Sequence, residues 1–403
     1  MKLLYFFIIA ATMLAASENS DEGGIITMTT SAECISFRFK GSGTVIIDWG
    51  DGSEKDTVEL VFSDDNDWSK LISRTGFDTN QRTITITGRN ITGLDCNTKI
   101  IILYTDRASP TCNQITALDV SRYTTLTEVD CSNNQLTKLD VSKNTALTKL
   151  DCGRNQLTEL DISKNTALTY LNCGNNQLTA IDVSRNTTLI GLHCNDNLLT
   201  ALDVSNNIAL LGLRLDNNQL TALDVSRNIA LEHLSCNNNP LTALDVSRHS
   251  ALKGLRCDNN QLAALDVSQN TALMVFSCNN NPLTALDVSR NTALIDFWCE
   301  NNPLTTLDLS KNTTLKFFSC KNNQLTALDV SQNTVLKFIK CDDNQLAADA
   351  LNHLFGTLHS NMVMDGFIDE GEQIATKTIF ISDNPGSADC DQSIAERKGW
   401  IVE

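Results

Sequence analysis

The chain has few aromatic residues, few prolines and few histidines. These low numbers limit the classes of function that the chain can have. Aromatic residues make up 5% of its 403 residues, and it contains 5 prolines and 5 histidines. Neither a Gly-x-Ser-x-Gly nor a His-Glu-x-x-His pattern occurs, so the motifs of serine hydrolases and zinc proteases are missing. We therefore expect a protein that is not an enzyme, with no catalytic residues.

Positive charge and long apolar runs are also scarce. The chain has 31 Lys and Arg against 48 Asp and Glu, which gives a formal net charge of −17. Nucleic acids and anionic membrane surfaces are bound by clustered basic residues, so we expect neither as a partner. Beyond the N-terminus no apolar run reaches the roughly 18 residues that a membrane-spanning helix requires. We therefore expect no membrane insertion.

The N-terminus has the layout of a secretory signal peptide. Lys2 precedes a mostly apolar run from Leu3 to Leu14, and small residues follow at positions 15–17. This order of basic, apolar and small residues is typical of a cleaved export signal. We expect a signal peptide over residues 1–17 and a linker over 18–24. The product is then secreted or displayed at the cell surface, with a periplasmic location as the alternative.

Cysteine, in contrast, is abundant and periodic. Ten of the 14 cysteines recur at intervals of 21 residues or twice that, and Leu215 fills the one missing slot. The ladder consists of Cys131, Cys152, Cys173, Cys194, Cys236, Cys257, Cys278, Cys299, Cys320 and Cys341. A fixed period over more than 200 residues indicates stacked structural units.

Stacked coils would hold equivalent Cα atoms about 4.8 Å apart with parallel Cβ vectors, which disfavours disulfides. A single file of thiols also cannot surround a metal ion as a tetrahedron. We therefore predict buried thiols that pack as small apolar groups. Cys34, Cys96, Cys112 and Cys390 lie off the ladder, and one or two of them could form disulfides.

Each coil contains two similar halves. In residues 147–167 the first half reads Leu-x-x-Leu-x-Cys-x-x-Asn, and the second ends in Leu-Asp-Ile-Ser-x-Asn. The last two apolar residues of each half are two apart, as in a half-buried strand, and an Asn follows where the chain must turn. The sequence predicts two short parallel strands per coil, with Asn amides that satisfy backbone groups at the bends.

This motif, with its continuation Gln-Leu-Thr-x-Leu-Asp-Val-Ser, resembles the bacterial leucine-rich repeat, in the 21-residue cysteine-ladder branch related to the internalins and to secreted repeat proteins of the Bacteroides type. The resemblance covers residues 91–346, with eleven regular coils. It implies a mainly β protein, a curved solenoid with a parallel concave sheet formed by the Cys-bearing strands. It also implies a secreted or surface interaction protein without a cofactor, and we expect a monomer.

A column of eleven Asp residues, from Asp119 to Asp329, recurs in the second half of the coils. A Lys or Arg three residues later, such as Lys143 after Asp140, predicts a surface of weak ion pairs and backbone hydrogen bonds. The alternative is a calcium column, but each ion would need several converging oxygens. We therefore predict no metal site.

Both flanks of the repeats break the period, as the caps of a solenoid must. Residues 25–90 contain alternating apolar runs, which predict a small β-sandwich. The segment Ile47–Ser53 resembles the Trp-x-x-Gly-Asp-Gly signature of PKD-like immunoglobulin-fold modules, with a shortened spacing. Residues 347–403 predict an α/β cap, with a helix over 347–358, a strand over 378–382 and a short helix over 391–398.

On the concave sheet that the resemblance implies, the residues one and three positions before each ladder slot point outward. These two columns vary, whereas their neighbours repeat. We interpret Trp298, Phe317 and Phe338, with Val275, as an exposed apolar patch beside Asp296; the alternative is that the predicted helix from residue 347 covers it. The middle of the columns carries a polar stripe, which consists of His193, Arg214, His233 and Arg256. The alternative interpretation of this stripe is a plain solvated face. The candidate ligand-binding residues are Tyr170, His193, Arg214, His233, Arg256, Asp296, Trp298, Phe317 and Phe338.

These features predict an exported, non-catalytic binding or adhesion protein that engages a protein partner through the concave face. A glycan-binding module that stacks sugars on Trp298, Phe317 and Phe338 is one alternative. A structural component of the cell envelope is the other.

Overall fold

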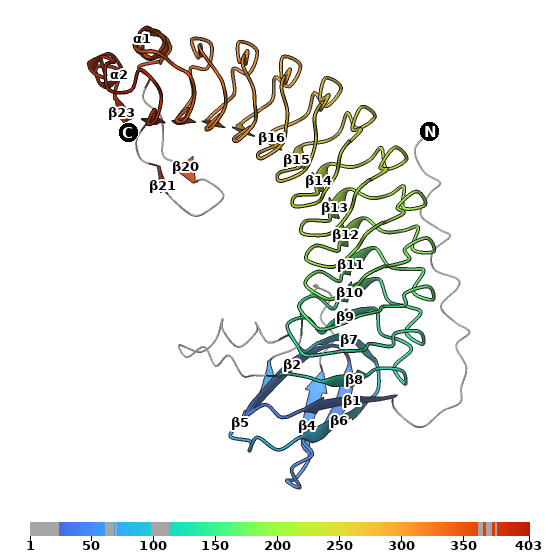
Figure 1. Cartoon of the computed structure of the whole chain (residues 1–403). Helices are drawn as coiled ribbons and strands as arrows, with labels where there is room; N and C mark the ends of the chain where they lie inside the picture. Colours follow the sequence, from blue (N-terminus) through green and yellow to red (C-terminus); the bar gives the residue numbers. More distant parts are fainter. Residues whose placement is uncertain are drawn as a thin grey trace, which may run out of the picture.

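The repeats form a curved solenoid with a small β structure at its N-terminal end and two helices at its C-terminal end (Figure 1). The computed structural model describes residues 24–60, 68, 71–97, 113–361, 366–367, 373–374 and 377–403. The predicted signal peptide, nearly all of the predicted linker, and Cys112 lie outside the described residues. In the part of the chain that the structure describes, no helix is long and apolar enough to cross a membrane.

The N-terminal part folds as two sheets around one apolar core. Its strands are β1 (Gly24–Thr30), β2 (Cys34–Gly41), β3 (Gly43–Asp48), β4 (Asp56–Leu60), β5 (Ile72–Thr75), β6 (Arg82–Gly88), β7 (Ile91–Asp95) and β8 (Ala117–Asp119). One sheet has the order β4-β3-β6-β1-β8, and β5, β2 and β7 open the other. Trp49 of the PKD-like segment is buried, stacks on Phe37 and donates its indole N–H to Asp56 Oδ2 at 2.7 Å.

This N-terminal part is continuous with the repeats. The strand β7 pairs in parallel with the first regular repeat strand, so β5, β2 and β7 extend the concave sheet. On the other sheet β8, which belongs to the repeats, pairs antiparallel with β1. Both open edges of the first coil are therefore covered by hydrogen-bonded strands, which protects them from pairing with other chains.

The concave face carries one three-residue strand per coil. These strands are β9 (Glu128–Asp130), β10 (Lys149–Asp151), β11 (Tyr170–Asn172), β12 (Gly191–His193), β13 (Gly212–Arg214), β14 (His233–Ser235), β15 (Gly254–Arg256), β16 (Val275–Ser277), β17 (Asp296–Trp298), β18 (Phe317–Ser319) and β19 (Phe338–Lys340). They pair in parallel with equivalent residues side by side, within one 16-stranded sheet. The strands line the inner side of the arc (Figure 1).

The predicted second strand in each coil is wrong for the coils from β9 onward, whose second halves are extended but contain no strand in the described residues. A curved solenoid is longer on its outer side, so neighbouring backbones separate there. Side-chain amides bridge them instead: Asn165 Nδ2 donates to Val141 O at 3.0 Å and to Asn144 O at 2.9 Å. The Asn at the first bend acts similarly, since Asn176 Nδ2 donates to Cys152 O and Cys173 O.

The cysteine ladder lies in the core, as predicted. All ten thiols and the Leu215 side chain are fully buried, and the thiols are free. Burial raises the pKa of the Cys152 and Cys278 thiols, for example, which disfavours the reactive thiolate. The Sγ atoms of Cys173 and Cys194 are 3.4 Å apart, well beyond the roughly 2.05 Å of a disulfide bond.

Cys96 extends this ladder, so its placement off the ladder was wrong. It follows β7, is fully buried, and its N–H donates to Asp130 O at 2.8 Å, as Cys131 N–H does to Asp151 O. Of the other cysteines off the ladder, Cys34 is disulfide-bonded, whereas Cys390 is a free, half-buried thiol.

The C-terminal part contains α1 (Ala348–Thr357), β20 (Gly366–Phe367), β21 (Gln373–Ile374), β22 (Lys377–Phe380), α2 (Ser393–Glu396) and β23 (Trp400–Val402). Helix α1 buries Leu351, Leu354 and Phe355 against the last coil. The strands β22 and β23 continue the concave sheet beyond β19. The two predicted helices and the predicted strand therefore occur, each within a few residues of its expected bounds.

Candidate binding face

The concave strands present two outward columns of side chains. In each strand the middle residue is fully or almost fully buried, whereas the residues on either side are mostly exposed or half-buried. These outward positions lie one and three residues before each ladder slot, where the sequence pattern places them. The sheet register sets equivalent residues side by side, so chemistry changes along the face in steps of one coil, about 4.8 Å.

Acidic side chains dominate the N-terminal end of this face. The register places Asp95, Asp130 and Asp151 side by side. Burial, reinforced by Asp130, raises the pKa of Asp95 to about 7, although Arg38 Nε lies 3.6 Å from its Oδ2. Sequence reasoning missed Asp95, because the coil that carries it lies outside the regular period.

The middle of the face carries the predicted polar stripe. Tyr170 Oη lies 3.2 Å from His193 Nδ1, and their rings make an edge contact with centroids 5.3 Å apart. Burial and, to a smaller extent, Arg214 lower the pKa of His193, which favours its neutral form. Arg214, His233 and Arg256 are exposed. The structure therefore brings these five residues together on five neighbouring strands, β11 to β15.

A hydrogen-bond network follows the turns after the strands in this region. Asp216 Oδ1 accepts from Ser235 Oγ at 2.6 Å and from the N–H of Asn237. Asp258 Oδ1 accepts in the same way from Ser277 Oγ and the N–H of Asn279. This network ties successive coils together beside the concave strands, which gives the face a rigid frame.

The C-terminal end of the face differs from the predicted open apolar patch. Trp298 and Asp296 are half-buried, but Phe317 and Phe338 are only 6% and 8% exposed. The prediction that Phe317 and Phe338 are exposed is therefore wrong. The ring of Phe338 packs between Trp298, at a centroid distance of 6.0 Å, and Phe380, at 5.5 Å.

The cause of this burial includes a strand that the repeat pattern did not contain. Because β22 pairs with β19, it places Phe380 beside Lys340 in the outward column. The Nζ of Lys340 lies 5.4 Å from the Phe338 ring centroid and 5.7 Å from that of Phe380. Trp298 therefore remains as the most accessible of the three predicted aromatic residues.

The opposite, convex side carries the Asp column. In each coil the carboxylate accepts a hydrogen bond from the backbone N–H of the Ser two residues later, as Asp308 does from Ser310 and Asp329 from Ser331. These hydrogen bonds lower the pKa of Asp140 more than Lys143 does. Hydrogen bonds from the Ser two residues later, which include the predicted backbone hydrogen bonds, thus stabilise the carboxylates of Asp140 and Asp182 more than the predicted ion pairs do.

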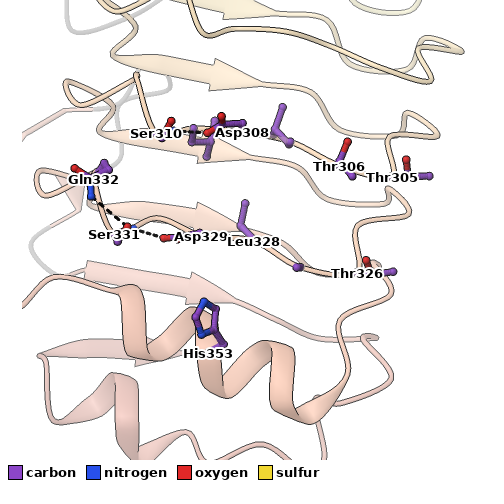
Figure 2. Close-up of a pocket in the computed structure, with 13 residues that line it drawn as sticks. Thr305, Thr306, Asp308, Ser310, Thr326, Leu328, Asp329, Ser331, Gln332 and His353 are labelled. Carbon is purple, nitrogen blue, oxygen red and sulfur yellow. Dashed lines mark hydrogen bonds between the residues drawn. The ribbon is translucent and has the colours of Figure 1, made fainter.

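Two shallow cavities lie along this column. One, of about 350 Å³, is lined by residues of the last coils and by His353 of α1, which faces the row of Asp and Ser side chains in Figure 2. The other, of about 770 Å³, contains Asp140, Asp161 and Asp182. Because the same residue types line both cavities, they belong to the repeating convex surface. In the described residues, no group of three or more His, Cys, Asp or Glu could hold a metal ion.

Comparisons with known proteins agree with this architecture. The family model "Leucine Rich repeats (2 copies)" matches residues 145–186. The functional domain of InlJ from Listeria monocytogenes, which includes a cysteine ladder, is 36% identical, with a TM-score of 0.57 over 68% of this chain and 70% of that one. No curated protein matches the chain.

Two more distant structures share the fold alone. An internalin, inlF, from Listeria monocytogenes is 20% identical, with a TM-score of 0.64 over 77% of this chain and 86% of that one. A leucine-rich repeat protein of Leptospira interrogans is 22% identical, with a TM-score of 0.58 over 72% of this chain and 82% of that one. The solenoid, its single concave sheet and its repeat thus define a leucine-rich repeat protein. More narrowly, the chain belongs to the internalin-like leucine-rich repeat proteins with a cysteine ladder.

Proposed function

We propose that the chain is an exported, non-catalytic binding or adhesion protein that engages a protein partner through its concave face. The observation that carries this proposal is the contrast between the two sides of the coil. The convex Asp and Ser and the inward Leu, Cys and Asn recur in nearly every coil, whereas the outward concave residues change from coil to coil. Fold stability accounts for a repeated residue, but a varied and exposed one is more readily explained by contact with a partner.

The chemistry of the face supports a protein partner. Acidic, basic and aromatic zones follow one another along one rigid sheet, and protein interfaces combine such polar zones with a few aromatic anchors. Of the predicted residues, Tyr170, His193, Arg214, His233 and Arg256 form the core of the proposed site. Trp298 and Asp296 extend it, whereas Phe317 and Phe338 are almost fully buried, and Phe338 packs against Trp298.

Export rests on the predicted signal peptide at residues 1–17. We propose secretion or display at the cell surface as a monomer, with a periplasmic location as the alternative. Protease treatment of intact cells that express the tagged protein separates these locations. Digestion of the tagged chain supports display at the surface, whereas protection until the outer membrane is opened supports the periplasm.

A photo-crosslinking residue at a concave position tests the binding proposal. Placed at Arg214 of the exported protein on intact cells, it should form a defined adduct. The same residue at Asp161 on the convex side should not. Adducts of equal yield from both positions would contradict binding through the concave face.

Glycan binding is a second candidate, and half-buried Trp298 is the residue that favours it. A glycan array separates the two functions, because binding to sugars that is lost in Trp298→Ala would support a lectin. A structural role in the cell envelope is supported if neither sugars nor proteins respond to concave substitutions.

A further inference from the structure

Four exposed aliphatic side chains gather at the edge of the concave sheet, at positions where the three preceding coils have threonine. Later coils carry Glu232, Lys253 and Met274 at the position of Leu211. Ile190, Ile208, Leu211 and Ile229 are 46%, 57%, 41% and 60% exposed. We call them the aliphatic edge. Leu211 N–H donates to Ile190 O at 2.9 Å, so these two lie on adjacent coils. Ile208 is three residues from Leu211, within roughly 10 Å along the chain, and Ile229 is its equivalent one coil later.

The fold does not need apolar side chains at these positions. The residues equivalent to Ile190 and Leu211 in the three preceding coils are Thr127, Thr148 and Thr169. The residues equivalent to Ile208 and Ile229 are Thr145, Thr166 and Thr187. The aliphatic edge therefore replaces residues with which the same coil folds, although exposing large apolar groups to water is unfavourable without a partner.

Two adjacent glycines lie directly beside the aliphatic edge. Gly191 and Gly212 open β12 and β13 and are neighbours in the sheet. Neither has the positive φ that favours glycine. A Cβ atom added to Gly212 would meet nothing within 4 Å, and one added to Gly191 would make its closest contact, 3.1 Å, with the Tyr170 ring.

Glycine within a strand is destabilising by roughly 0.5–1 kcal/mol relative to Ala. Gly212 therefore weakens its strand, although neither close packing nor a positive φ requires glycine there. Such a glycine often marks a place where another backbone approaches closely. The pair leaves a gap in the outward column, bounded by Tyr170 on one side and His233 on the other. We call this the glycine gap.

Arginine side chains lie beside the glycine gap, although the whole chain is acidic. Glu232, on the coil after Leu211, is paired with Lys253 at 2.8 Å. Arg214 lies beside the gap in the other outward column, and Arg256 is exposed in the same column two coils further. The chain as a whole carries a formal net charge of −17. A local basic group in such a chain favours a segment that brings its own carboxylates.

We propose that the aliphatic edge and the glycine gap form one docking site for an extended segment of a partner protein that carries aliphatic side chains next to carboxylates. The backbone of the segment crosses Gly191 and Gly212. Its aliphatic side chains pack on the aliphatic edge, and its carboxylates pair with Arg214 and Arg256. This site rests on the proposed function, because it specifies where on the concave side the protein partner binds and with what chemistry.

The repeat itself provides substitutions that spare the fold. Ile190→Thr with Leu211→Thr restores the residue of the preceding coils, and Gly212→Thr fills the gap with a good strand former. Met274→Thr is the matched control, because Met274 is 40% exposed and occupies the same position as Leu211 three coils later. Urea unfolding checks that each variant is at least as stable as the parent.

A random peptide library displayed on phage is the probe. Selection on the full chain should enrich peptides with aliphatic residues next to Asp or Glu. Their affinity should fall at least about tenfold, or 1.4 kcal/mol, in Ile190→Thr/Leu211→Thr and in Gly212→Thr, and stay unchanged in Met274→Thr. Failure to enrich such peptides, or equal binding to all variants, overturns the docking site.

The other outcomes separate this inference from the proposed function. Peptides that lose binding in Tyr170→Ala or Trp298→Ala, but not in the edge and gap variants, would leave concave binding in place and reject this docking site. Peptides that respond to no concave substitution would reject both. Sedimentation velocity tests a second copy as the occupant: a dimer that Ile190→Thr/Leu211→Thr dissociates would reject an extended partner segment.

Discussion

The residue that closes the second half of each of the eleven coils is Asn in nine, His249 in one and Tyr123 in the first. The nine Asn side chains and His249 are almost or fully buried. In the neighbouring coils Asn228 Nδ2 and Asn270 Nδ2 each donate to two backbone carbonyls of the preceding coil, at 2.8–2.9 Å. His249 has a bond of 3.0 Å between Nε2 and Val225 O, and its buried Nδ1 has no partner among the described residues. One inter-coil hydrogen bond is therefore missing at this position.

We predict that His249→Asn stabilises the protein. The amide restores the second hydrogen bond to the preceding coil, which contributes about 0.5–1.5 kcal/mol. The midpoint of urea unfolding, followed by circular dichroism, measures the change. The reverse substitution Asn291→His should destabilise by a similar amount, and a His249→Asn variant less stable than the parent would contradict the hydrogen-bond argument.

Single residues were predictable from the sequence where the period holds. Each position of the 21-residue repeat has the same environment in every coil. This explains the burial of the cysteines and of Leu215, and the hydrogen bonds of the Asn at each bend. Cys96 was missed because it lies 35 residues before Cys131 instead of 21. The 14 extra residues fall between Cys96 and Asn113, whose Nδ2 donates to Cys96 O. Counting from the regular coils could not reveal a slot displaced by an insertion.

At the scale of elements, the sequence predicted one strand of each coil correctly and the second wrongly. In both halves the apolar residues alternate with a period of two, but a strand also needs a neighbouring backbone at hydrogen-bonding distance. In the second halves the backbones of neighbouring coils make single hydrogen bonds, such as Gln156 N–H to Leu136 O at 2.8 Å, and no strand forms there from β9 onward among the described residues. Curvature is a property of the stack, which the pattern of one coil does not contain. The sequence did predict a strand over 378–382, but not that β22 pairs with β19 and places Phe380 in the outward column.

The acidic residues Asp95, Asp130 and Asp151 at the adjacent ends of β7, β9 and β10 lead to a prediction on how stability depends on pH. The pKa of Asp95 is raised from 3.8 to about 7 in the folded protein, mainly by burial and next by Asp130. Between these values the folded state binds more protons than the unfolded state, so this group makes stability fall as pH rises from about 4 to about 7. Asp95→Asn should remove that decline in stability and raise the free energy of unfolding at pH 8 by about 2 kcal/mol. The gain is smaller than the full pKa shift would give, because Arg38 loses its carboxylate partner.

Urea unfolding at pH 5 and pH 8 measures this effect. Asp161→Asn is the control with the opposite sign, because hydrogen bonds to Ser163 lower the pKa of Asp161. Because Asp161 is ionised at both pH 5 and pH 8, that substitution should reduce the free energy of unfolding at both pH values. Equal loss of stability from both substitutions at pH 8 would contradict a raised pKa at Asp95.

At the scale of the whole molecule, the solenoid has one uninterrupted core that runs from the N-terminal sheets to the last helix. Each coil contacts only its neighbours, so the core is protected by stacking and by the covered ends. The eleven ladder thiols, Cys96 included, report on this core along its full length. Cys390 packs against the C-terminal end of this core and is half-buried.

We predict that a maleimide reagent modifies Cys390 in the native protein but none of the ladder cysteines until the solenoid unfolds. The ladder thiols are fully buried, and burial raises the pKa of nearly all of them. The reagent therefore cannot reach the thiols, and little of the reactive thiolate form is present. Mass spectrometry after brief labelling at increasing urea should show the ladder thiols reacting as circular dichroism is lost. Cys390→Ser should lower the native stoichiometry by one. Rapid native labelling of a ladder cysteine would mean that the coils open locally, and the thiols would then not be packing groups of a closed core.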